Sequence, residues 1–98
     1  MILTGKQKRF LRAQANTLPA FFQVGKEGLS ESLYLTIDTA LEAHELVKIT
    51  QLKTCTLSKE AIADAITAAT KSHLVQTIGH TYIFYRPSKK NLYELPKE

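Results

Sequence analysis

The fold is decided between residues 21 and 30, which read FFQVGKEGLS. Aromatic and β-branched side chains in Phe21–Val24 predict a short strand. Gly25 and Gly28 predict a tight turn after it, because glycine adopts backbone angles that other residues avoid. Leu29 and Ser30 then predict the start of a helix, since a serine side chain accepts a hydrogen bond from a free amide of the first turn. A strand followed so closely by a helix is typical of a crossover connection.

The segments on either side extend this alternation of helices and strands. Thr4 and Gln7 match a capping box, which predicts that a first helix begins there and runs to about Asn16. Apolar residues recur at helical spacing over residues 33–44 and again over residues 61–69, where Ser58 is the expected cap. The complete prediction is helices over 4–16, 30–44 and 58–69, and strands over 21–24, 46–52, 73–78 and 81–86.

The order α-β-α-β-α-β-β predicts a single α+β domain over residues 1–98, with its core at about 2–90 and a short polar C-terminal tail. The last two strands are joined by Gly79 and His80 and must be antiparallel. Helices separate the first three strands, so these strands can pair in parallel. A mixed four-stranded sheet with both crossover helices on one face follows, which is a two-layer α/β sandwich. The sequence leaves open what covers the opposite face and whether the first helix contributes.

The composition is that of an ordinary globular domain. Apolar residues make up 44% and charged residues 22% of the 98 residues, values that argue against disorder. No apolar run is long enough to cross a membrane, and residues 1–12 lack the apolar segment of a secretory signal. The single cysteine, Cys55, excludes an internal disulfide and a multi-thiolate metal site. We therefore expect a cytoplasmic protein that is not bound to a membrane.

Positive charge is concentrated at the two ends of the chain. The net charge is +4 over residues 1–28, −3 over residues 29–66 and +3 over residues 67–98. In the first helix, the basic side chains Lys8, Arg9 and Arg12 share one side, opposite Phe10 and Leu11. If the two chain ends meet in the fold, they form one positive face that suits a polyanion such as RNA. The alternative is a set of solvated lysines that keep the protein soluble.

The segment Gly25-Lys26-Glu27-Gly28 is the sharpest candidate for a binding site. Two glycines allow a ligand to approach the backbone, and the helix that follows points free amides at the turn. Lys26 adds a mobile cation, whereas Glu27 places a negative charge in the same turn. This chemistry suits a nucleic-acid backbone, as in the GxxG loop of the KH module, although a plain tight turn has the same sequence.

The last strand and the residues after it carry the remaining candidates. The aromatic run at residues 82–85 suits either base stacking or core packing. Arg86 is suited to pair with phosphate beside Lys89 and Lys90, or instead to cap a helix or bind Glu94. The three histidines are not at metal-ligand spacing, and the sequence contains no nucleotide-binding or nucleophile motif. We therefore expect no metal, no cofactor and no catalytic activity.

Several segments together resemble the YhbY family, the stand-alone bacterial form of the CRM (chloroplast RNA splicing and ribosome maturation) domain. The matching segments span about residues 2–90 and occur in one order. They are KQKRFLR at 6–12, VGKEGLS at 24–30, ALEAHELVKI at 40–49, VQTIGHT at 75–81 and YRP at 85–87.

The resemblance implies an RNA-binding domain whose fold is similar to the C-terminal domain of bacterial translation initiation factor three. It also implies association with the precursor of the large ribosomal subunit, and a GxxG loop that lies beside a basic surface. This chain departs from the family pattern at Glu27, where a small polar or basic residue is usual, and at Ser72, where many members have glycine. Carried onto this chain, the implied RNA-binding residues are Gly25, Lys26, Glu27, Gly28, Lys6, Lys8, Arg9, Arg12, Arg86 and Lys89.

Two functions follow from the sequence. The first is a monomeric RNA-binding protein that assists assembly of the large ribosomal subunit and contacts mainly the RNA backbone. The alternative is a non-catalytic protein-interaction module that docks on a ribosomal protein or a translation factor. In that alternative the open sheet face supplies the surface, and Tyr82 and Phe84 are the candidate anchors.

Overall fold

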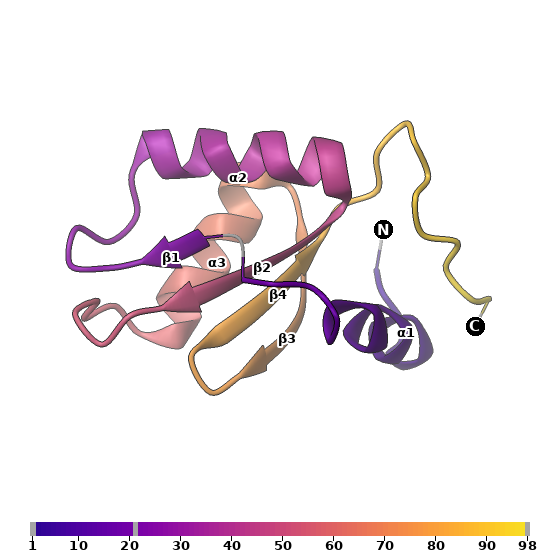
Figure 1. The fold of residues 1–98 in the computed structure, drawn as a ribbon, viewed down its shortest axis with the longest axis horizontal. Helices are drawn as coiled ribbons and strands as arrows, with labels where there is room; N and C mark the ends of the chain where they lie inside the picture. The colour runs from indigo at the N-terminus through magenta and orange to yellow at the C-terminus, as the bar shows by residue number, and fades with distance from the viewer. Residues whose placement is uncertain (1, 21, 98) are drawn as a thin grey trace.

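The computed structural model describes residues 2–20 and 22–97, and it confirms the predicted order of helices and strands (Figure 1). Phe21, which the sequence places at the start of the first strand, lies outside the described residues. The elements are α1 (Gly5–Ala15), β1 (Phe22–Val24), α2 (Glu31–His44), β2 (Leu46–Gln51), α3 (Lys59–Thr70), β3 (His73–Ile78) and β4 (Thr81–Tyr85).

The helices begin at the predicted caps. Thr4 Oγ1 accepts a hydrogen bond from the amide of Gln7 at 3.1 Å, and Gln7 Oε1 accepts one from the amide of Thr4 at 3.0 Å. Ser30 and Ser58 each accept a hydrogen bond at 3.1 Å from the amide three residues further along. These bonds satisfy amides that have no partner inside the helix, so the cap residues set where each helix starts.

The four strands form one sheet in the order β1-β2-β4-β3. β1 pairs with β2 in parallel, and β4 pairs antiparallel with both β2 and β3. The predicted α+β class and the mixed four-stranded sheet are therefore confirmed. Since β1 and β2 run in parallel, the turns that follow them lie at the same end of the sheet, and the β3–β4 hairpin turn joins them there (Figure 1).

One face of the sheet is covered by α2 and α3. Val47 and Ile49 of β2 and Tyr82 and Phe84 of β4 are fully buried there. The rings of Tyr82 and Phe84 lie nearly parallel, with centroids 6.3 Å apart. The expectation that these two aromatics anchor a protein partner is therefore wrong. Alternation along β4 turns them toward the helical layer, whereas the sequence could not tell which face the helices cover.

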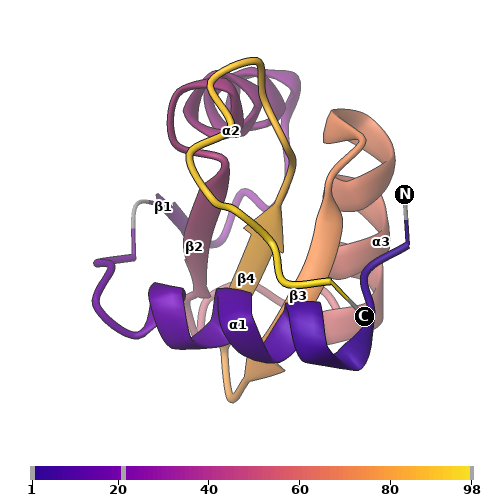
Figure 2. The ribbon, with the colours of Figure 1, turned by 90° about the vertical axis from the view of Figure 1, so that its right-hand side faces the viewer.

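The other face is covered in part by α1. Leu11 and Ala15 are fully buried against Leu46, Ile83 and Tyr85, and Tyr93 and Leu95 of the C-terminal segment pack against the same cluster. Figure 2 shows α1 crossing β2, β4 and β3 at one end of the sheet, with the C-terminal segment beside it. The first helix thus adds a partial third layer, which answers the question that the sequence left open.

Polar contacts fasten α1 at both of its ends. Lys48 on β2 points its ammonium at the C-terminal end of α1 and donates to the carbonyls of Ala15 at 3.5 Å and Leu18 at 3.3 Å. A cation at this position interacts favourably with the helix dipole. At the other end, Gln7 Nε2 donates to the carbonyl of Pro96 at 3.1 Å. The position of α1 is therefore set by β2 and by the C-terminal segment.

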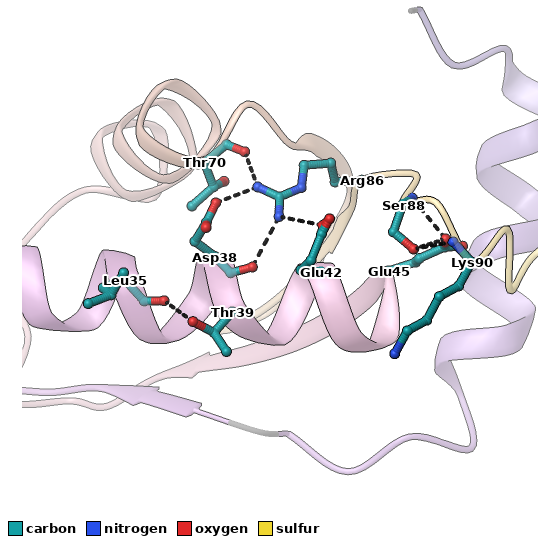
Figure 3. A network of polar contacts seen from close by, with 9 residues as sticks. All are labelled: Leu35, Asp38, Thr39, Glu42, Glu45, Thr70, Arg86, Ser88 and Lys90. Carbon is teal, nitrogen blue, oxygen red and sulfur yellow. Dashed lines mark hydrogen bonds and ion pairs between the residues drawn. The ribbon is translucent and has the colours of Figure 1, made fainter.

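A buried carboxylate organises the C-terminal segment. Glu45 ends α2 with a φ of +65° and is fully buried. Its carboxylate accepts hydrogen bonds from the amide and hydroxyl of Ser88 at 2.8 and 2.5 Å, and from the amides of Leu92 at 2.9 Å and Tyr93 at 3.3 Å (Figure 3 shows the Ser88 contacts). Burial by itself raises the pKa of Glu45, but these hydrogen bonds outweigh it and hold the pKa below its ordinary value of 4.5.

Replacing Glu45 with glutamine should lower the free energy of unfolding by about 3 kcal/mol at neutral pH, because an amide NH₂ would face backbone donors in a buried site. The native pKa lies below the unfolded one, so the stabilisation is complete above about pH 5 and is lost as pH falls through the native pKa. The difference between wild type and Glu45→Gln, measured by urea denaturation, should therefore shrink in acid.

The matched control is Glu42→Gln on the same helix. Glu42 is mostly exposed and lies 3.9 Å from its only ion-pair partner among the described residues, Arg86, so its loss should change the free energy of unfolding by less than about 0.5 kcal/mol. Equal effects of the two substitutions at neutral pH would contradict the proposed role of Glu45.

Candidate nucleic-acid interface

The segment Gly25–Gly28 forms a tight turn between β1 and α2. The amide of Gly28 donates to the carbonyl of Gly25 at 2.9 Å, which closes the turn. Gly28 has a φ of +69°, a backbone conformation that residues other than glycine rarely adopt. Lys26 and Glu27 are both exposed at the tip. The turn therefore offers one cation and one anion to a ligand, together with glycine backbone that is partly exposed.

The segment after β2 supports this turn. The amide of Leu52 donates to the carbonyl of Val24 at 2.8 Å, and the side chains of Leu52 and Thr54 lie beside Gly25. Gln51 holds the segment from inside, since its amide nitrogen donates to the carbonyl of Leu57 at 2.9 Å. Tyr82 in turn donates its hydroxyl proton to Gln51 Oε1 at 2.6 Å. The turn thus rests on a second loop that a buried polar pair holds in place.

We call the surface formed by residues 25–31, 52–60 and 78–81 the loop end. It contains the starts of α2 and α3, whose first amides have no partner within their helices. The charges here balance, since there are as many lysines as acids. They are Lys26, Lys53 and Lys59 against Glu27, Glu31 and Glu60, all exposed. The loop end therefore offers hydrogen-bond donors rather than net positive charge.

Net positive charge lies instead on α1. Its four basic residues, Lys6, Lys8, Arg9 and Arg12, are all exposed, and the helix contains no acid. We call this surface the α1 basic face. It lies at the other end of the 39 Å long axis from the loop end (Figure 1). The family resemblance implied that Lys8, Arg9 and Arg12 lie beside the GxxG loop, and this expectation is therefore wrong.

The physical reason for this separation is the packing of α1. Leu11 and Ala15 are buried against Leu46, the first residue of β2, and against Tyr85, the last residue of β4. The GxxG turn follows the last residue of β1, which pairs with Gln51 at the far end of β2. A strand of six residues is about 20 Å long, so the length of β2 separates the two surfaces.

Arg86 is engaged inside the protein. Its guanidinium donates to Asp38 Oδ1 at 2.5 Å, to the carbonyl of Asp38 at 3.0 Å and to the carbonyl of Thr70 at 2.7 Å (Figure 3). The sequence left open whether Arg86 binds phosphate, caps a helix or pairs with Glu94. The structure places it at the C-terminal end of α3 as a cap, with Asp38 as its ion-pair partner. We therefore leave Arg86 out of the interface.

Lys89 is exposed in the C-terminal segment that Glu45 organises, and Figure 1 shows this segment at the same end of the long axis as α1. The two basic chain ends thus do approach one another, as the hydrogen bond from Gln7 to Pro96 also shows. The loop end is not part of that surface. Lys53 belongs to the loop end but was not singled out from the sequence. The rule that turns after parallel strands share one end of the sheet was the signal that could have found it.

Two further observations limit what the surface can do chemically. Within residues 2–20 and 22–97, no group of three or more His, Cys, Asp or Glu side chains is arranged to hold a metal ion. In the same part of the chain, no helix is long and apolar enough to span a membrane.

Comparison with known proteins points to one family. The model of the CRS1 / YhbY (CRM) domain matches residues 3–86. The chain is 48% identical over 90 residues to the probable RNA-binding protein YqeI of Bacillus subtilis, covering 92% of this chain and 94% of that protein. It is 38% identical over 96 residues to an RNA-binding protein of Haemophilus influenzae, covering 98% of this chain and 97% of that one.

A solved structure agrees with these relatives. The solution structure of SAV1595 from Staphylococcus aureus, a protein proposed to bind RNA, superposes with a TM-score of 0.82 at 44% sequence identity. The similarity covers 97% of this chain and all of that chain. Sequence and fold therefore match over nearly the whole length.

The structural assignment of Arg86 predicts a large effect on stability. Arg86→Met should lower the free energy of unfolding by about 2 kcal/mol, because it leaves Asp38 and the end of α3 without their partly buried cation. Lys89→Met, which removes an exposed cation three residues later, should change it by less than about 0.5 kcal/mol. Chemical denaturation of both variants tests this, and a stable Arg86→Met protein would return Arg86 to the list of candidate RNA ligands.

Proposed function

Because this chain belongs to the CRS1 / YhbY (CRM) domain family, we propose that it is a non-catalytic protein that binds RNA. The names of its relatives from Bacillus subtilis and Haemophilus influenzae support RNA as the partner. The observation that carries the proposal is the α1 basic face, where four exposed cations stand on one helix without an acid. Such a surface attracts a polyanion and releases its counterions.

The two surfaces supply different parts of the binding. Lys6, Lys8, Arg9 and Arg12 provide the electrostatic attraction, and Lys89 adds an exposed cation in the C-terminal segment. The turn Gly25–Gly28 provides close contact, because a phosphate can reach its backbone and the first amides of α2, while Lys26 approaches from the tip. Contacts of both kinds address the RNA backbone, so we expect weak dependence on base sequence.

We further propose that the RNA is the precursor of large-subunit ribosomal RNA, bound by a monomer in the cytoplasm. The resemblance to the YhbY family supports this finer assignment. Sedimentation of a cell lysate tests it, since the protein should travel with large-subunit precursor particles and leave them after nuclease digestion. If the protein still travels with a protein complex once RNA is digested, the alternative of a protein-interaction module is correct.

The salt dependence of binding should report the α1 basic face. If four or five phosphates are contacted, the logarithm of the affinity for single-stranded RNA should fall with the logarithm of salt concentration with a slope of about −3 to −4. Arg9→Glu should make that slope shallower by about 0.7 or more, because at least one phosphate contact is lost. The control is Lys90→Glu, which reverses an exposed charge at a residue outside the proposed contacts. A wild-type affinity that does not change with salt concentration would rule the proposal out.

The tip of the GxxG turn offers two substitutions of opposite sign. Lys26→Glu should weaken RNA binding and Glu27→Lys should strengthen it, each by about tenfold, because both side chains are exposed at the point of closest approach. Fluorescence anisotropy with labelled RNA at fixed salt measures both affinities. The turn is not a contact if the two variants bind as wild type does while Arg9→Glu still weakens binding.

A further inference from the structure

We propose that single-stranded RNA crosses the part of the sheet face that α1 leaves uncovered, and so runs from the α1 basic face to the loop end. This inference rests on the proposed function, and it explains how two surfaces at opposite ends of the molecule serve one ligand. It assigns binding to Gln23, Thr50 and Thr81, none of which is among the RNA-binding residues that the sequence motifs and the family resemblance implied.

The uncovered surface is a row of four side chains across the sheet. The strand register places Gln23 beside Thr50, Thr50 beside Thr81, and Thr81 beside Ile78. Gln23 is exposed, Ile78 is 50% exposed, and the two threonines are partly exposed. We call these four residues the open row.

The open row lies on the same face as α1. Side chains alternate along a strand, and Leu46 and Lys48 of β2 both contact α1, so Thr50 faces the same way. In β4, Ile83 and Tyr85 belong to the α1 cluster, which places Thr81 on that face too. Figures 1 and 2 show α1 at one end of the strands, so the rows toward the loop end extend beyond it.

The distribution of acidic residues favours the open sheet face as the route for a polyanion. The open row contains no acid, and neither does the next row toward α1, which consists of Lys48, Ile83 and Gln76. The opposite side of the molecule carries exposed acids along both helices that cover it. Beyond the loop end they are Glu42 of α2 and Asp64 of α3. A phosphate chain that joins the two surfaces therefore meets carboxylates along α2 and α3 but none across the sheet.

The side chains of the open row suit an unpaired strand. Threonine hydroxyls and a glutamine amide both donate and accept hydrogen bonds, which matches base edges and the ribose 2′-hydroxyl. Beside the row, Gln76 Oε1 is a buried acceptor with no hydrogen-bond partner among the described residues. The four strands span only about 14 Å across. Unpaired bases of a single strand can reach such a surface, whereas the bases of a duplex cannot, because they are paired inside it.

The experiment places charge in the open row. Thr50→Glu and Thr81→Glu should each weaken binding of a uridine-rich RNA of about 12 nucleotides by tenfold or more, because a carboxylate would lie within a few ångströms of phosphate. Thr81→Lys should strengthen binding. Thr39→Glu is the matched control, since Thr39 is exposed on α2, on the other side of the molecule, and it should leave the affinity within twofold of wild type. Thermal melting of each variant checks that it is folded.

Photocrosslinking of wild-type protein to 4-thiouridine RNA provides a second measurement that needs no variant. Crosslinks should map to the peptides that contain Gln23, Thr50 or Thr81. A duplex of the same length should compete poorly.

The outcomes separate this inference from the proposed function. If Arg9→Glu weakens binding while all open-row variants bind as wild type does and crosslinks map elsewhere, the route across the sheet is wrong and RNA binding stands. If wild-type protein binds no RNA at low salt, the proposed function itself fails. Equal affinity for duplex and single strand would overturn the assignment of a single strand.

Discussion

The structure depends on a carboxylate that has no cationic partner among the described residues. Glu45 sits at the junction between α2 and β2, and four hydrogen-bond donors from Ser88, Leu92 and Tyr93 neutralise the cost of burying it. Those donors come from a segment that would otherwise be a loose polar tail. Once it is fixed, Tyr93 can pack against α1 and the carbonyl of Pro96 can receive the side chain of Gln7. A single buried charge thereby sets where the C-terminal segment lies, and through it helps to set where the first helix lies.

The position of α1 in turn decides how the surface is divided. The helix covers the end of the sheet where β2 begins and leaves the other end open, so its cations stand apart from the turns. Lys48 lies on β2 at the boundary between the covered and the open part of this face. Its ammonium donates hydrogen bonds to carbonyls at the end of α1. Arg86 plays the equivalent part on the other face, where it joins α2 and α3 through Asp38 and Thr70. Lys48 and Arg86 are thus cations that hold helices in place, although their charge alone would suggest that they bind a ligand.

Local signals in the sequence were sufficient to predict where the helices and strands lie. They were insufficient to predict which residues pack against one another in the fold. Caps such as Thr4 and Ser58 and the periodicity of apolar residues located all the helices and strands, because these signals act within a few residues. The burial of Tyr82 could not be predicted in this way. Period-two alternation along a strand shows that the two faces of the sheet differ, but not which face the helices cover. The partners of Arg86 lie 16 and 48 residues away in the chain, and no local pattern specifies such contacts. The separation of the α1 basic face from the GxxG turn has the same origin.

This separation gives the two surfaces different physical characters. The α1 basic face carries net charge without acids, so its attraction acts at a distance and is screened by salt. At the loop end Lys26, Lys53 and Lys59 are matched by three acids, so attraction at a distance is weak there and any affinity must come from short hydrogen bonds to amides. A ligand drawn in by the first surface therefore gains from the second only if it reaches across the sheet, where the open row is a route that carries no acid. Long-range capture at one end and short-range contact at the other are compatible with one strand because the sheet face between them carries no acid, whereas Glu42 of α2 and Asp64 of α3 lie on the opposite side of the molecule.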